Sequence, residues 1–185
     1  MVRSSSRRLL FSLSSLYLLL ILAAAIAAPH IAPYSPTEQQ LERRFHAPDS
    51  HNILGTDELG RDILTRIIYG SRPALVVGLV TVSIALLLGG FFGLLAGMGH
   101  NALDSSIMLL MDSMLSFPTI LLAITVVSFM GYGLVQVMLA LGIISSPVFA
   151  RLIRAETLSI KTEGYIEAAR ALGTPTVKIV FKHIV

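Results

Sequence analysis

Four apolar segments, each about long enough to cross a lipid bilayer, limit what this chain can fold into. They span residues 9–28, 74–98, 113–130 and 134–150. A membrane-spanning helix needs about 20 predominantly apolar residues at roughly 1.5 Å each. The sequence therefore predicts an all-α membrane protein, a polytopic helical bundle with four spans.

The composition points the same way. Hydrophobic residues make up 54% of the 185 residues and charged residues only 14%, whereas a soluble domain carries about a quarter charged residues. The absence of cysteine excludes disulfides, thiolate metal sites and a cysteine nucleophile. A net charge of +3 does not indicate a nucleic-acid partner.

Basic residues predict the orientation of the chain in the membrane. Arg3, Arg7 and Arg8 precede the first span, which places the N-terminus inside by the positive-inside rule. Four crossings then return residues 151–185 to the cytoplasm, and this tail carries six Lys or Arg against three Glu.

The first span has a second interpretation. An Arg-rich start, an apolar run and the sequence Ala25-Ile26-Ala27 before Ala28-Pro29 also describe a cleavable signal peptide. The apolar run is somewhat long for that role and three further spans follow, which favours an uncleaved anchor.

Residues 29–71 form the one long segment expected on the extracytoplasmic side. Thr56 can cap a helix whose first turn carries Asp57 and Glu58. An apolar stripe in this helix predicts that it is amphipathic and lies at the membrane surface, although a core-facing helix fits the stripe equally well. The prolines that we expect to prevent the first helix from continuing are Pro29, Pro33 and Pro36. The stripe consists of Leu59, Ile63, Leu64, Ile67 and Ile68.

Histidines are the only residues of this segment that suggest a metal site. His30, His46 and His51 follow no ligand spacing, and scattered loop histidines are usually solvated. We predict no metal site.

Small and polar residues within the spans suggest packing and pathway roles. Gly89, Gly93 and Gly97 repeat every four residues, which allows close helix–helix approach in lipid. Asp112 directly precedes the third span, at the cytoplasmic interface, where it can form a structural ion pair or take part in the pathway. Pro118 is expected to kink the third span, either as a flexible gate or as a fixed bend.

The cytoplasmic tail contains a short helix with a defined end. Gly173 supplies its left-handed exit, and Thr174 followed by Pro175 then predicts a second helix. Its polar face carries Glu163, Glu167 and Arg170, and its opposite face carries Tyr165, Ala169 and Leu172.

This tail resembles the EAA loop of ABC importer permeases, through Glu167-Ala168-Ala169, three further residues and Gly173. The segment 54–62, Leu-Gly-Thr-Asp-Glu-Leu-Gly-Arg-Asp, resembles the LGTDxLGRD signature of dipeptide, oligopeptide and nickel permeases. Residues 68–72, Phe117-Pro118 and residues 150–154 match the same family in order. The resemblance covers nearly the whole chain from residue 33 onward.

The resemblance implies a type I importer permease in the bacterial inner membrane. Its expected partners are a second homologous permease, two ATP-binding subunits, an extracytoplasmic substrate-binding protein and membrane lipid. ATP and Mg²⁺ would then be bound by the ATPase and not by this chain. The residues that would dock to the ATPase are Tyr165, Glu167, Ala168, Ala169, Arg170 and Gly173.

Missing motifs agree with a transport subunit that is not itself an enzyme. The chain has no G-x-x-x-x-G-K-[ST] for ATP, no H-E-x-x-H and no G-x-S-x-G. An ion-driven carrier would need ionisable groups deep in its spans, and only Asp112 comes near. A non-transporting membrane scaffold or an inert permease fragment is the remaining alternative.

We expect three regions: a cytoplasmic start with the first anchor (1–28), an extracytoplasmic segment (29–71), and an incomplete permease domain (72–185) with its coupling loop at 151–185. Such permeases usually have six spans, and the second coupling helix breaks off at residue 185. The sequence therefore suggests a truncated chain. It does not separate dipeptide, oligopeptide and nickel as substrates, and peptides are the default expectation.

Overall fold

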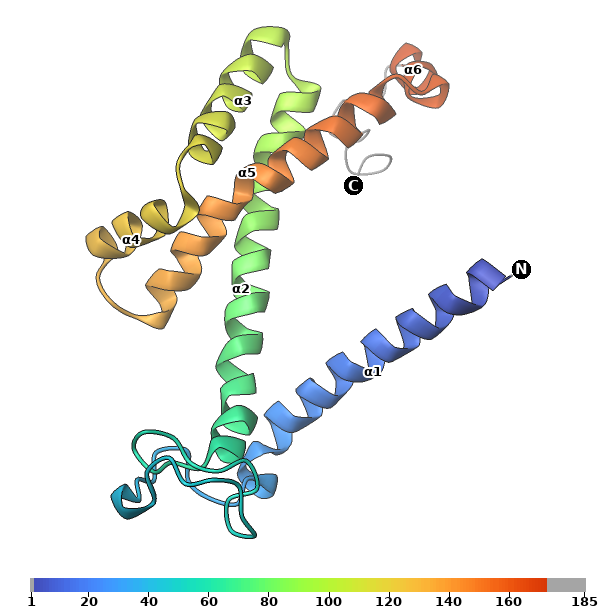
Figure 1. Ribbon diagram of the computed structural model, residues 1–185. Helices are drawn as coiled ribbons and strands as arrows, with labels where there is room; N and C mark the ends of the chain where they lie inside the picture. The colour runs from blue at the N-terminus through green and yellow to red at the C-terminus, as the bar shows by residue number, and fades with distance from the viewer. Residues whose placement is uncertain (1, 173–185) are drawn as a thin grey trace. The chain divides into compact units, whose positions relative to one another are not determined.

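The computed structural model describes residues 2–172, without the side chains of residues 2–8 and 167–170. Every regular element within this range is helical, so the predicted all-α fold is confirmed (Figure 1). The helices are α1 (Val2–Ile31), α2 (Ile63–Met98), α3 (Asn101–Ser116), α4 (Thr119–Met130), α5 (Leu134–Lys161) and α6 (Gly164–Ala171), with a 3-10 turn η1 (Leu41–Arg43).

Three of the described helices are long and apolar enough to cross a membrane by themselves. They are Leu9–Ile31 within α1, then α2 and α5, and the bent pair α3 and α4 supplies a fourth crossing if it counts as one span. The chain divides into two compact units, residues 1–77 and 78–185, with the boundary inside α2. Each unit is described separately.

In the first unit, α1 does not stop at Pro29 as the sequence predicted. A proline in a helix has no N–H for the carbonyl four residues earlier, which here belongs to Ala25. Arg72 replaces that donor, because its Nε donates to the Ala25 carbonyl at 2.5 Å and its Nη2 to the Ile26 carbonyl at 3.2 Å. The helix therefore continues to Ile31.

The prediction of a separate amphipathic helix starting at Thr56 is also wrong. The helix α2 begins at Ile63, where Asp62 is the N-cap: its Oδ2 accepts the N–H of Thr65 at 2.7 Å. Gly60 adopts a left-handed φ of +72°, so the chain before Asp62 turns instead of continuing as a helix. Because α2 runs unbroken through Pro73 to Met98, all but the first residue of the apolar stripe belong to the start of a spanning helix.

In the second unit, the third span is not one helix over 113–130. Helix α3 already begins at Asn101 and α4 follows it at an angle of 97°. Phe117 is extended (φ −89°, ψ 141°) because the ring of the following proline disfavours helical backbone at the preceding residue. Pro118 then occupies the N-cap position of α4, which begins at Thr119, so the predicted kink is a complete break.

Helix α5 extends eleven residues past the predicted end of the fourth span, to Lys161. Pro147 lies inside it, and the Ser146 hydroxyl donates at 2.7 Å to the Ile143 carbonyl, which the proline leaves without a helical donor. Helix α5 packs against α3, α4 and α6. A small core forms where α2, α3 and α5 meet, from Ala96, Ile107, Met111 and Ala150.

Candidate coupling and packing sites

Helix α6 carries the predicted docking motif and follows α5 after only two residues. Ile166 is completely buried, whereas the Tyr165 side chain is about half exposed. Ile166 was not predicted as an anchor, although an isoleucine directly before Glu-Ala-Ala in an amphipathic helix was a usable signal. The side chains of Glu167, Ala168, Ala169 and Arg170, all of Gly173 and the second predicted helix lie outside the described residues.

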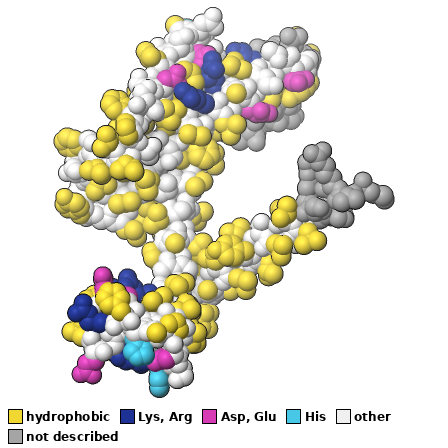
Figure 2. Space-filling view, in the orientation of Figure 1, with side chains coloured by type: hydrophobic (Ala, Val, Ile, Leu, Met, Phe, Trp, Pro, Cys, Tyr) yellow, Lys and Arg dark blue, Asp and Glu magenta, His cyan; other side chains and the backbone are white. Residues whose placement is uncertain are grey.

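Charged side chains connect α5 to α3. Arg154 binds Asp104 in a bidentate ion pair, with Nε to Oδ1 at 2.5 Å and Nη2 to Oδ2 at 2.6 Å. Arg151 binds Asp112 through Nη2 and Nε, at 2.6 Å and 3.1 Å from Oδ1. Figure 2 shows basic and acidic side chains gathered over these two helices.

The predicted site residue Asp112 thus takes part in an ion pair. Asp104 was missed in the sequence, because a carboxylate in an expected loop gives no sign of its partner fifty residues away. The basic residue of the last turn of α5 makes a further link: Lys161 donates to the carbonyl of Gly97 at 3.3 Å.

The glycines singled out in the sequence lie where α2 approaches α5. A Cβ added at Gly89 would lie 2.5 Å from the Ser146 carbonyl oxygen, and one at Gly93 would lie 2.6 Å from that of Ala150. At Gly97 the nearest atom would be the Thr157 Cβ at 2.6 Å. Only hydrogen fits at these positions, so the ridge sets the distance between the two helices.

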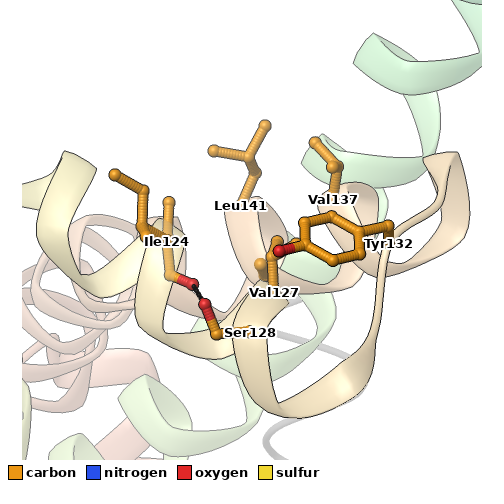
Figure 3. Close-up of a pocket in the computed structure, with 8 residues that line it drawn as sticks. Ile124, Val127, Ser128, Tyr132, Val137 and Leu141 are labelled. Carbon is orange, nitrogen blue, oxygen red and sulfur yellow. Dashed lines mark hydrogen bonds between the residues drawn. The ribbon is translucent and has the colours of Figure 1, made fainter.

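An apolar cavity of about 270 Å³ lies between α4 and α5 (Figure 3). The Ser128 hydroxyl donates to the Ile124 carbonyl within α4 at 2.8 Å, so its hydrogen atom is already used. The walls have no charged group and suit an apolar group. The lining residues are Ala123, Ile124, Val127, Ser128, Tyr132, Val137, Ala140 and Leu141. Pro118 precedes α4 and is not among them.

In the first unit, the signature segment 54–62 folds into a compact cap on the start of α2. Asp57 accepts the backbone N–H groups of Leu59 at 2.8 Å and Arg61 at 3.0 Å, and pairs with the side chains of Arg61 and Arg66. Burial alone would raise the pKa of the Asp57 carboxyl. The N–H and guanidinium donors outweigh burial and hold that pKa well below its usual range.

Glycines and a second aspartate complete the cap. Gly55 and Gly60 have φ of +75° and +72°, and a Cβ at Gly60 would lie 1.9 Å from the Gln40 carbonyl oxygen. Asp62 accepts a hydrogen bond from the Asn52 amide at 3.0 Å in addition to capping α2. The signature therefore encodes a structural cap. Within the described part of the chain no three His, Cys, Asp or Glu side chains gather as a metal site.

Comparison with known proteins places the chain in a family. Residues 89–185 match the family described as binding-protein-dependent transport system inner membrane component. Residues 6–48 match the N-terminal transmembrane domain of oligopeptide transport permease C. The chain belongs to this family of inner-membrane transport components, which confirms the resemblance seen in the sequence.

Curated relatives agree with this assignment. A di/tripeptide transport system permease protein of Pseudomonas aeruginosa is 41% identical over 172 residues, covering 90% of this chain and 57% of the relative. A glutathione transport system permease protein of Pectobacterium atrosepticum is also 41% identical, covering 92% and 57%. A dipeptide transport system permease protein of Alkalihalophilus pseudofirmus is 41% identical, covering 86% and 53%. The chain thus spans less than two thirds of the length of these relatives. Its family and its apolar helices make it a multi-pass inner-membrane protein.

Proposed function

We propose that this chain is a permease subunit of an ATP-driven importer of dipeptides and oligopeptides. Family membership and the names of the relatives, which are di/tripeptide, glutathione and dipeptide permeases, support this function. The further partners we propose are a second homologous permease, two ATP-binding subunits that hold ATP and Mg²⁺, and an extracytoplasmic binding protein that delivers the peptide.

The observation that carries the proposal is the direct connection from a spanning helix to the helix with the docking motif. Only Thr162 and Glu163 separate α5 from α6, and the buried Ile166 fixes α6 by its apolar side. A displacement of α6 is therefore passed to α5. In the proposed orientation the N-terminus and α6 lie in the cytoplasm, where ATP is available, and the cap lies on the other side.

In this mechanism, ATP-driven closure of the two ATPase subunits shifts α6, and α5 tilts to switch access to the pathway. ATP can drive this change only by binding one of the two states more tightly. In this proposal Glu167 and Arg170 would make polar contacts to the ATPase, Ala168 and Ala169 would permit a close fit, and Gly173 would set the elbow.

Native mass spectrometry of the protein extracted gently from its own membrane tests the partners. We expect a complex containing an ATPase and a second permease. A chain without either partner would contradict the proposal and favour a membrane scaffold or an inert fragment.

Gly173→Asp tests the coupling role, because a bulky charged side chain at the elbow should disturb docking without affecting membrane insertion. We expect ATP hydrolysis to continue while peptide uptake is lost. Normal uptake in this variant would remove the coupling role of the motif.

A further inference from the structure

Polar links at one end of α5 reach two separate points of α3. Asp104 and Asp112 are eight residues apart, about 12 Å along α3, whereas their partners Arg154 and Arg151 are three residues apart, about 4.5 Å along α5. Two arginines that lie close together on α5 thus bind two aspartates that lie farther apart on α3. Two anchor points at this separation fix both the position and the direction of α3.

The two ion pairs differ in burial and geometry. The side chains of Arg154 and Asp104 are 32% and 19% exposed, and they bind through two parallel hydrogen bonds. Arg151 and Asp112 are 52% and 53% exposed and share a single carboxylate oxygen. Exposed pairs contribute little, whereas a bidentate arginine–carboxylate pair imposes a definite geometry. The Asp104–Arg154 pair therefore dominates the connection.

The Asp104–Arg154 pair joins two helices that each lead into another helix, so it can transmit a displacement from one helix to the next. Helix α5 leads into α6, and α3 leads through the 97° break into α4. The apolar cavity lies between α4 and α5, so any difference in the movements of α3 and α5 changes its walls.

We infer that Asp104 and Arg154 are positioning residues that make α3 follow α5 when α6 is displaced, so that α4 moves with them. This inference rests on the proposed function, since it specifies how the displacement reaches the membrane helices beyond α5. The pair acts through geometry and need not touch the transported peptide. Arg154→Lys should therefore be harmful although it keeps the charge, because lysine lacks the planar fork of donors.

The test uses the complete transporter, isolated with its partners and reconstituted in proteoliposomes. Uptake of radiolabelled alanyl-alanine and ATP hydrolysis are measured on the same preparation. The variants are Asp104→Asn, Arg154→Lys and the charge exchange Asp104→Arg with Arg154→Asp. Ser113→Ala, at an exposed position of α3 whose hydroxyl donates to the Leu109 carbonyl of the same helix, is the matched control.

We expect Asp104→Asn and Arg154→Lys to lower the peptide taken up per ATP by at least about fivefold, the lower end of ordinary coupling effects. The charge exchange should restore this ratio to within about twofold, and the control should leave it unchanged. A purely structural role would lower uptake and hydrolysis together with the amount of assembled complex, and this result would overturn the inference. An unchanged ratio of peptide taken up per ATP would also overturn it. So would a charge-exchange variant whose ratio is no higher than that of Asp104→Asn.

Spin labels give a second readout that does not depend on the peptide. The chain contains no cysteine, so Ser105→Cys on α3 and Glu156→Cys on α5, both exposed, introduce its two labelling sites. The partner subunits are used in cysteine-free form. The distance between the labels should be the same in the nucleotide-free and ATP-bound transporter, and it should differ between these states in Asp104→Asn. If the distance changes between the two states in the protein that carries only the two labels, the inference is overturned and the proposed function is unaffected. If that protein fails to import alanyl-alanine, the proposed function is contradicted.

Discussion

Gly89→Ala should separate α2 from α5, because the added methyl group meets backbone atoms that cannot move aside. Its Cβ would lie 2.5 Å from the Ser146 carbonyl oxygen and 2.9 Å from the Ala150 nitrogen. An ordinary carbon–oxygen contact is longer by roughly 0.5–1 Å, and a gap of that size loses about a quarter to a half of the dispersion attraction across the interface.

The neighbouring glycine provides a matched control. A Cβ at Gly90 would meet only the Cδ1 of Ile153, at 3.5 Å, which is an ordinary contact. Both substitutions replace glycine by alanine in the same helix, so the gain in helix propensity cancels between them. The difference in unfolding free energy is then the overpacking cost, about 1–3 kcal/mol.

The assay is reversible unfolding in mixed micelles of dodecyl maltoside and SDS, followed by circular dichroism. Gly89→Ala should unfold at a lower SDS fraction than Gly90→Ala, and Gly93→Ala should behave like Gly89→Ala because its Cβ also meets a backbone carbonyl. Equal midpoints for Gly89→Ala and Gly90→Ala would refute the reasoning.

Three further predictions concern the first unit. Gly60→Ala should make the cap more sensitive to limited proteolysis than Gly70→Ala, because the left-handed φ of +72° costs a side chain about 1–2 kcal/mol. A Cβ at Gly70 meets nothing within 4 Å beyond its neighbours in the chain and the backbone of its own helix, and equal cleavage rates would contradict the prediction. Arg72→Leu should speed amide hydrogen exchange at the end of α1, because a carbonyl without a donor costs about 1–3 kcal/mol. Adding Pro29→Ala should reverse most of this effect, because alanine restores the missing N–H. No recovery in the double variant would count against the role of Arg72. The native pKa of Asp57 lies below its ordinary value, so the unfolded chain binds more protons in acid than the folded chain does. The resistance of the cap to an acid-stable protease should therefore stay level from pH 7 to about 5 and fall below about pH 4. Asp57→Asn should weaken this pH dependence, and an unchanged profile would contradict the prediction.

Much of the fold was predictable because hydropathy and helix periodicity are local. In lipid every backbone polar group needs an internal partner, so a long apolar segment becomes a helix whatever surrounds it. The family signatures were readable for a related reason, since they depend on fixed residues at fixed spacing. Gly89, Gly93 and Gly97 belong to this class, because a four-residue repeat places them on one helix face without further information.

The prolines show where local rules failed. The sequence predicted that Pro29 ends its helix, whereas α1 continues past it, and Pro118, expected only to kink a span, breaks it completely. A proline is tolerated when another group binds the carbonyl that it leaves without a donor. For Pro29 that group is Arg72, from the following helix, so no local rule could have found it.

Composition and spacing along the chain were enough to predict a polytopic membrane protein and its apolar spans. The resemblance of short motifs to a known family indicated the class of permease and the place of the predicted docking motif. The tertiary structure alone decided the continuous course of α2, the 97° break before α4 and the pairing of Asp104 with Arg154. Each of these depends on whether a polar or charged group finds its partner on another element, and such a partner becomes visible only after the helices have packed.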